Sequence, residues 1–132
     1  ISTVCAQLEH RDGDVRRAAL RGLLQVAEKG DEDLIGEVAM RLEHQSSYVR
    51  QAATKALPHV ADKGDTCAVD AVAKRLKHES GSVRESAVKA LVEVVERGAD
   101  DRAVLEASAL LEDEEDSVRL AAIETLALVA ER

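Results

Sequence analysis

The apolar residues of the chain recur at the three- and four-residue spacing of amphipathic helices. One stripe of this kind runs through residues 15–27 and mixes alanine with valine and leucine. A shorter stripe runs through residues 35–42. Because long and short stripes alternate along the rest of the chain, the pattern predicts pairs of helices, and the second helix of each pair is the longer one.

The predicted helix pair is an internal repeat. A Leu-Glu-His tripeptide begins at Leu8, returns 34 residues later at Leu42, and returns as Leu-Lys-His at Leu76 after another 34 residues. Val-Arg dipeptides begin at residues 15, 49, 83 and 118, so their last step is 35 residues. Glycines at positions 30, 64 and 98 keep the 34-residue step. The extra residue therefore belongs between Gly98 and Val104, in a loop.

Copied hairpins that can bury their apolar faces only against their neighbours form solenoids. We therefore expect an all-α, right-handed α-α superhelix of four hairpins, with about eight helices. Residues 1–132 form a single repeat domain, with repeats at approximately 1–30, 31–64, 65–98 and 99–132. The chain opens at Ile1 rather than at a methionine, which indicates a piece of a longer protein.

The turn residues agree with the periodicity. Gly30 and Gly64 each precede an aspartate, the order expected when a left-handed glycine ends one helix and an N-cap begins the next. Pro58 is expected to interrupt the second helix of the second hairpin, because proline lacks an N–H and its ring clashes with an earlier carbonyl. The N-caps predicted for the second helices of the first three hairpins are Asp12, Ser46 and Ser80.

The repeated pattern resembles a known family. Leu-x-x-x-x-x-x-Val-Arg-x-Ala-Ala-x-x-Ala-Leu, clearest in residues 42–57 and 76–91, resembles HEAT repeats and especially the HEAT-like repeats of phycobilisome lyases. The resemblance covers essentially the whole chain and implies the solenoid fold, whereas HEAT solenoids serve many unrelated assemblies. Tetratricopeptide repeats share the 34-residue period, but their aromatic signature is absent, since the sequence has no Trp and no Phe.

Composition narrows the possible partners. Tyr48 is the single aromatic residue, so we expect a core of small aliphatic side chains. The formal net charge of −8 disfavours nucleic acid, which is bound mainly through Lys and Arg. The apolar runs are shorter than the roughly 18 residues of a membrane span, so no membrane insertion is expected. Cys5 and Cys67 are too few for a disulfide scaffold and lack metal-ligand spacing, which favours an intracellular, cytoplasmic location.

The recurring histidines His10, His44 and His78 invite a metal site. Equivalent positions in neighbouring hairpins lie on the order of 10 Å apart, whereas zinc holds each ligand nitrogen at about 2.0–2.1 Å. Each histidine ends a first helix, so we expect it to cap that helix by donating to the last carbonyls. No catalytic, cofactor or metal constellation is apparent, and the chain is predicted not to be an enzyme.

The iron-binding motif of one HEAT-like enzyme family is missing from this sequence. Deoxyhypusine hydroxylase binds iron through His-Glu pairs placed just after the Val-Arg of its second helices. The matching dipeptides here begin at Arg17, Gln51, Glu85 and Leu120, and none is His-Glu. The resemblance to HEAT repeats therefore implies no iron site in this chain.

The second helices are the candidates for binding, because they usually line the concave side of such solenoids. Their predicted surface columns include a basic row, Arg21, Lys55 and Lys89, which would attract an acidic peptide or would simply be a solvated row. The full predicted concave face is Arg17, Arg21, Gln25, Gln51, Lys55, His59, Glu85, Lys89 and Glu93. The Val-Arg arginines are expected to form a structural ladder that bonds to the loops between helices: Arg16, Arg50, Arg84 and Arg119.

The last predicted helix carries apolar residues outside the core columns, which favours a protein contact there through Leu120, Ile123 and Leu128. Further repeats or end-to-end self-association would cover such a face. The favoured function is a non-catalytic scaffold that binds a protein or peptide. The alternatives are a subunit like the phycobilisome lyases and nucleic-acid binding through the basic row.

Overall fold

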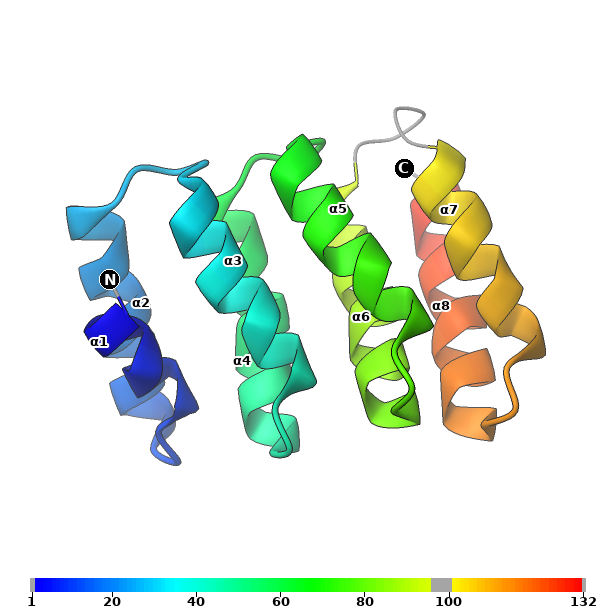
Figure 1. Ribbon diagram of the computed structural model, residues 1–132, viewed down its shortest axis with the longest axis horizontal. Helices are drawn as coiled ribbons and strands as arrows, with labels where there is room; N and C mark the ends of the chain where they lie inside the picture. Colours follow the sequence, from blue (N-terminus) through cyan, green and yellow to red (C-terminus); the bar gives the residue numbers. More distant parts are fainter. Residues whose placement is uncertain (1, 96–100, 132) are drawn as a thin grey trace.

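The protein is a row of four helical hairpins (Figure 1). The computed structural model describes residues 2–95 and 101–131, which contain α-helices and short 3-10 helices and no strand. Each hairpin has a first helix that ends in a 3-10 turn and a second, longer helix. The hairpins are α1 (Ser2–Ala6), η1 (Gln7–Glu9) and α2 (Gly13–Val26); α3 (Glu32–Met40), η2 (Arg41–Glu43) and α4 (Ser47–Val60); α5 (Thr66–Ala73), η3 (Lys74–Lys77) and α6 (Gly81–Val94); α7 (Asp101–Ser108), η4 (Ala109–Glu112) and α8 (Asp116–Glu131).

The hairpins stack in sequence order into two layers. The first helices α1, α3, α5 and α7 form one layer, and the second helices α2, α4, α6 and α8 lie behind them (Figure 1). Within the second layer α4 packs on α6 and α6 packs on α8, whereas α2 and α4 touch less extensively. The all-α HEAT-like solenoid predicted from the repeat is therefore confirmed, and the spacing of α2 and α4 leaves room for a groove between them.

The described core is aliphatic throughout. One continuous cluster of buried residues runs from Cys5 in the first hairpin to Ala122 in the last, and consists of Leu, Val, Ile, Ala and Cys side chains. Tyr48 lies outside it, with 66% of its surface exposed. Small residues on the facing surfaces let the helices approach closely, which explains how a core without rings can still be well packed.

The predicted punctuation is confirmed at the junctions between the first three hairpins. Gly30 and Gly64 have φ angles of 96° and 86°, a region that residues with a Cβ rarely occupy. The following aspartates cap the next helices, because Asp31 accepts from the N–H of Leu34 and Asp65 accepts from that of Ala68. Gly98 lies outside the described residues.

Two local predictions were wrong. Asp12 caps α2 with its side chain, but Ser46 and Ser80 occupy the N-cap positions of α4 and α6 without any side-chain capping bond. Pro58 does not interrupt α4, which continues to Val60 and has the same 14-residue length as α2 and α6. Because Pro58 lies in the last turn, only the end of the helical ladder loses a donor.

The extra residue of the last repeat lies before the end of α7. The 3-10 turns of the first three hairpins end 34 residues apart, at Glu9, Glu43 and Lys77, and the last one ends 35 residues later, at Glu112. The same 35-residue step separates the ends of α5 and α7. Of the segment between Gly98 and Val104, where the extra residue was predicted, residues 98–100 fall outside the described residues.

Candidate protein-binding face

The second helices present the surface columns that the repeat predicts. Most members are exposed, whereas Glu85 and Glu93 in α6 are half-buried. Two of the cations have a carboxylate partner on their own helix: Arg17 with Asp14, and Lys89 with Glu85, whose Nζ and Oε2 atoms are 2.9 Å apart. Within the described part of the chain, Arg21 and Lys55 have no ion pair. The second-helix face thus keeps two cations that can bind a carboxylate from outside.

The Val-Arg arginines anchor the loops between the two helices of each hairpin. Arg16 Nη1 donates to the carbonyls of His10 and Arg11 at 2.8 and 3.1 Å. Arg50 and Arg84 make the equivalent pair of bonds in their hairpins, and Arg119 donates to the carbonyl of Asp113. Each arginine therefore fixes a loop with one nitrogen. The remaining nitrogens of Arg84 and Arg119 bind carboxylates, those of Asp113 and Asp116.

The Nε and Nη2 atoms, which form the second edge of the guanidinium, bind a carboxylate in the case of Arg84. Its Nε and Nη2 donate to the two carboxylate oxygens of Asp113, in the next hairpin, at 2.8 and 3.1 Å. This fork-to-fork geometry is the preferred way for arginine to hold a carboxylate. The bonds hold the pKa of Asp113 below its ordinary value and raise that of Arg84. The equivalent edges of Arg16 and Arg50 have no carboxylate partner among the described residues.

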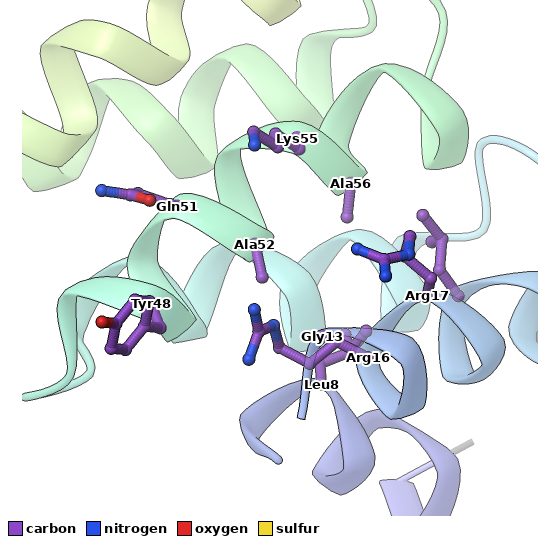
Figure 2. A pocket seen from close by; sticks show the side chains of 10 residues that line it. Leu8, Gly13, Arg16, Arg17, Tyr48, Gln51, Ala52, Lys55 and Ala56 are labelled. Carbon is purple, nitrogen blue, oxygen red and sulfur yellow. The ribbon is translucent and has the colours of Figure 1, made fainter. Parts of the chain in front are cut away.

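Arg16 lines a groove of about 220 Å³ between α2 and α4. Figure 2 shows its side chain lying between the ring of Tyr48 and the side chain of Arg17, with Lys55 on the neighbouring helix. The guanidinium carbon of Arg16 is 6.0 Å from the centroid of the Tyr48 ring. Three cations and no carboxylate line this groove, and its apolar lining is Leu8, Leu20, Ala52 and Ala56.

Arg50 lines a second groove, of about 180 Å³, between α4 and α6. Lys55 and Gln51 border both grooves, so the two lie side by side along the same face. The second groove has three cations and one carboxylate, that of Glu85, and all of its lining residues are polar or charged. Its hydroxyl groups belong to Ser47, Thr54, Ser82 and Ser86.

The histidines lie where the sequence placed them but act in a different way. His10, His44 and His78 are the C-cap residues of the first three 3-10 turns. Their Nδ1 atoms do not donate to the last carbonyls; each accepts the N–H of the residue two positions later, at 3.0 Å. An imidazole that accepts at Nδ1 carries its proton on Nε2. The predicted capping chemistry was wrong, because the side chain serves the start of the second helix.

The free Nε2 of these histidines joins neighbouring hairpins. His44 Nε2 lies 2.9 Å from Glu9, and His78 Nε2 lies 3.1 Å from Glu43. The same two glutamates bind arginines of the next hairpin: Glu9 binds Arg41 at 3.1 Å, and Glu43 binds Arg75 at 2.8 Å. These contacts are part of the fold and therefore do not form a ligand site.

The three apolar residues predicted as a protein contact on the last helix are all exposed, but they belong to two surfaces. Leu120 and Leu128, 57% and 52% exposed, continue the surface columns of the second-helix face. Ile123, 57% exposed, falls in a separate column with Leu20, Thr54 and Val88. Only Leu120 and Leu128 therefore extend the candidate binding face.

Sequence reasoning missed the groove between α2 and α4. From the sequence alone, Tyr48 is only the single aromatic residue, and Arg16 is only a member of the structural ladder. The repeat does contain a signal for both, since Tyr48 aligns with Asp14, Ser82 and Ser117 and is the one large side chain in that column. The depth of the groove depends on how closely α2 approaches α4, which periodicity does not give.

The described part of the chain holds no group of three or more His, Cys, Asp or Glu side chains arranged to bind a metal ion. None of its helices combines the length and apolar character needed to cross a membrane. Burial raises the pKa of both cysteine thiols, those of Cys5 in the core and Cys67 at the start of α5, so neither is an activated nucleophile.

Two comparisons with known proteins bear on the family. The family model for HEAT repeats matches residues 1–91 and, in an overlapping second match, residues 38–127. The matches together cover nearly the whole chain, all four hairpins included. A comparison with curated proteins found none that matches this sequence.

Proposed function

Since the chain belongs to the HEAT repeat family, whose repeats are generally scaffolds for protein interaction, we propose that it binds an acidic segment of another protein along its second-helix face. The observation that carries this proposal is the charge of the groove between α2 and α4. Three cations and no carboxylate line it, although the protein as a whole has a formal net charge of −8. Such local inversion of charge favours a ligand of opposite sign.

The arginine edges indicate which anion would fit. Arg84 already holds a carboxylate through Nε and Nη2, that of Asp113. Arg16 and Arg50 are anchored in the same way and border the two grooves. A ligand aspartate or glutamate would repeat the geometry of Asp113 at either arginine, with Lys55 between the grooves adding a second cation.

The apolar lining adds a requirement for a side chain next to the acid. Leu8, Leu20 and two alanines line the first groove, and the exposed Tyr48 ring stands beside it. Burying an aliphatic or aromatic anchor there contributes roughly 25 cal/mol per Å² of apolar surface. We therefore expect the ligand to be an extended segment with acidic residues flanking one apolar residue.

The experiment is a fluorescence-anisotropy titration with peptides that share one apolar anchor and carry an increasing number of acidic neighbours. Affinity should rise with the number of acids and fall with added salt. Lys55→Glu should weaken binding roughly tenfold or more, because the introduced carboxylate repels an acidic ligand at both grooves. Lys74→Glu makes the same charge change on an exposed residue of the first-helix layer and should leave the affinity nearly unchanged.

Parallel titrations with a DNA duplex and with a bilin distinguish the alternative functions. The proposal would be refuted if Lys55→Glu and Lys74→Glu lowered the peptide affinity equally. It would also be refuted if the affinity did not depend on the number of acidic residues in the peptide. Tighter binding of the duplex than of the acidic peptides would favour a nucleic-acid interface. Bilin binding detected by absorbance would favour a function like that of the phycobilisome lyases.

A further inference from the structure

The groove between α4 and α6 contains serine and threonine side chains that the groove between α2 and α4 lacks. Most lining positions of the two grooves correspond, 34 residues apart. Four positions of the first groove are occupied by Gly13, Leu20, Tyr48 and Ala52. The same four positions of the second groove are occupied by Ser47, Thr54, Ser82 and Ser86. Between α6 and α8 the equivalent positions hold one serine, since they are Gly81, Val88, Ser117 and Ala121.

Three of the four hydroxyl groups in the second groove are available to a ligand. Thr54 Oγ1 donates to the carbonyl of Arg50 at 3.1 Å, so its proton is already in use. The side chains of the three serines make no hydrogen bond with a residue that the structure describes: Ser47, Ser82 and Ser86. Because a hydroxyl group carries one proton to donate, this groove offers three such donors.

Two of the three cations in the second groove are also available. Lys89 is paired with Glu85, the one carboxylate of the lining, at 2.9 Å, so these two charges offset each other. Arg50 uses Nη1 for two loop carbonyls, and its Nε and Nη2 atoms meet no carboxylate among the described residues. Lys55 reaches both grooves and has no ion pair in the described part of the chain. Arg50 and Lys55 can therefore bind an anion together.

This set of donors fits a phosphate group better than a carboxylate. A carboxylate has two oxygens, and the contact of Arg84 with Asp113 shows that one arginine edge engages both. A phosphate monoester has three acceptor oxygens and a charge of about −1.5 to −2 at pH 7, and arginine holds it through the same bidentate fork. The third oxygen and the additional charge would be matched by the serine hydroxyls and by Lys55.

The two grooves lie one repeat apart, which fixes the spacing of groups on a ligand that fills both. Arg16 and Arg50 occupy equivalent positions on neighbouring second helices, and packed helices are about 8–10 Å apart. An extended chain advances about 3.3–3.6 Å per residue, so three residues span this distance. A segment whose acidic residue binds Arg16 therefore brings the residue three positions away to Arg50.

We propose that the second groove binds a phosphorylated serine or threonine of the ligand segment, three positions from the acidic residue that binds Arg16. Arg50 holds two phosphate oxygens through Nε and Nη2, Lys55 neutralises charge, and the serine hydroxyls donate to the phosphate. This inference rests on the proposed function, because the phosphate belongs to the same acidic segment. Phosphorylation of the partner therefore strengthens its binding to this chain, and dephosphorylation weakens it.

The test uses peptides that differ only in the residue facing Arg50, which is phosphoserine, glutamate or serine. In anisotropy titrations the Kd of the phosphoserine peptide should be roughly tenfold below that of the glutamate peptide. Moving the phosphoserine next to the acidic residue should remove most of this gain, since the phosphate then lies too far from Arg50. Phosphoserine that binds no tighter than glutamate, or equally well at both positions, would overturn the inference. The proposed function fails only if affinity is also unchanged when both acidic residues are replaced by serine.

The double variant Ser82→Ala, Ser86→Ala tests the hydroxyl groups. It should weaken binding of the phosphoserine peptide roughly fivefold and change that of the glutamate peptide less than about twofold, because Arg50 and Lys55 are intact. Ser117→Ala is the matched control, since it removes the exposed hydroxyl at the equivalent position of α8. Far-ultraviolet circular dichroism establishes that each variant is folded. Equal losses for both peptides, or an equal loss in the control, would contradict the assigned donors.

Competition experiments identify the source of the phosphate. Unlabelled phosphoserine peptide should displace the labelled peptide, whereas inorganic phosphate at the same concentration should not, because it has no contacts in the first groove. Equal displacement by inorganic phosphate would show that the groove takes a free anion and would overturn the assignment to a phosphorylated segment. Tighter binding of a DNA duplex than of the phosphoserine peptide would overturn it as well.

Discussion

Replacing Asp113 by asparagine removes one carboxylate at the third hairpin junction while keeping the size of the side chain. In the native protein the carboxylate accepts two bonds from Arg84 and one from the N–H of Glu115. An asparagine can still accept from Glu115 through Oδ1, but its amide nitrogen then presents hydrogens to the Arg84 guanidinium. The substitution therefore removes the charge of the pair and keeps the bond from Arg84 Nη2 to Oδ1, but it sets a donor, the amide nitrogen, against Arg84 Nε.

The size of the effect follows from the burial of the pair. The side chains of Arg84 and Asp113 are only 10% and 7% exposed, so water compensates the loss poorly. Hydrogen bonds to charged groups contribute about 1.5–3 kcal/mol each, and removing one partner of a buried pair costs about 3–5 kcal/mol. Because Arg84 keeps two bonds through Nη1, we expect a loss of about 2–3 kcal/mol of unfolding free energy.

Urea unfolding followed by circular dichroism measures this loss, and Glu114→Gln is the control. Glu114 also lies near Arg84, at 4.0 Å, but its side chain is 85% exposed, so its amide variant should cost less than about 0.5 kcal/mol. In a stacked repeat each hairpin is stabilised mainly by its neighbour. Hydrogen exchange in α8 should therefore quicken more than exchange in α4.

The pH dependence provides a second check. Arg84 holds the folded-state pKa of Asp113 below its ordinary value of 3.8. A carboxyl group with a depressed pKa stabilises the fold above its unfolded-state pKa and loses that contribution as pH falls through the folded-state pKa. The stability gap between the native protein and Asp113→Asn should be constant near neutral pH and narrow below about pH 4. The reasoning would be refuted if Asp113→Asn lowered the unfolding free energy no more than Glu114→Gln does. It would also be refuted if the difference from the native protein stayed the same at acidic pH.

Three further predictions concern single residues. His44→Asn should cost about 1 kcal/mol of unfolding free energy, because the bond to Glu9 is lost; His10→Asn, which loses no contact between hairpins, should be nearly neutral. Gly64→Ala should destabilise by about 1 kcal/mol or more, since its φ is 86°, whereas Gly36→Ala, in a helix with open space around the added Cβ, should stabilise by about 0.5–1 kcal/mol; thermal melts of both decide. Cys67 should react with a disulfide reagent more slowly than a free thiol at the same pH, and Cys5 should react only on unfolding, because burial raises the pKa of both; equal rates in native and denatured samples would contradict this.

The fold could be predicted from the sequence because the apolar pattern of one helix pair is repeated four times. A helix pair with the same apolar columns in every copy has only its neighbours to pack against, so stacking order follows from the repeat. The Gly-Asp steps were readable for a similar reason, since left-handed glycines and aspartate N-caps are local features. Ser46 and Ser80 show the limit of that approach, because both occupy the N-cap position but neither side chain makes a capping bond.

Only part of the candidate site could be predicted from the sequence. Columns of surface residues follow from helical periodicity, which is how Lys55 and Arg17 were found. Whether a column borders a groove depends on the distance between neighbouring second helices. Contacts between hairpins, such as Glu9 with His44, depend on which edge of a side chain faces the next copy. Neither quantity is encoded in the spacing of residues along one chain.

The Val-Arg arginine connects the fold to the proposed function. One nitrogen of each guanidinium holds the loop of its own hairpin, so its position is set before any partner arrives. In α6 the other edge binds Asp113 and strengthens a junction; in α2 and α4 the same edge borders a groove. A side chain fixed in advance loses little conformational freedom on binding a carboxylate. Repetition thus supplies preorganised arginine forks, and the acidic residue that fills one of them internally indicates what the others would bind.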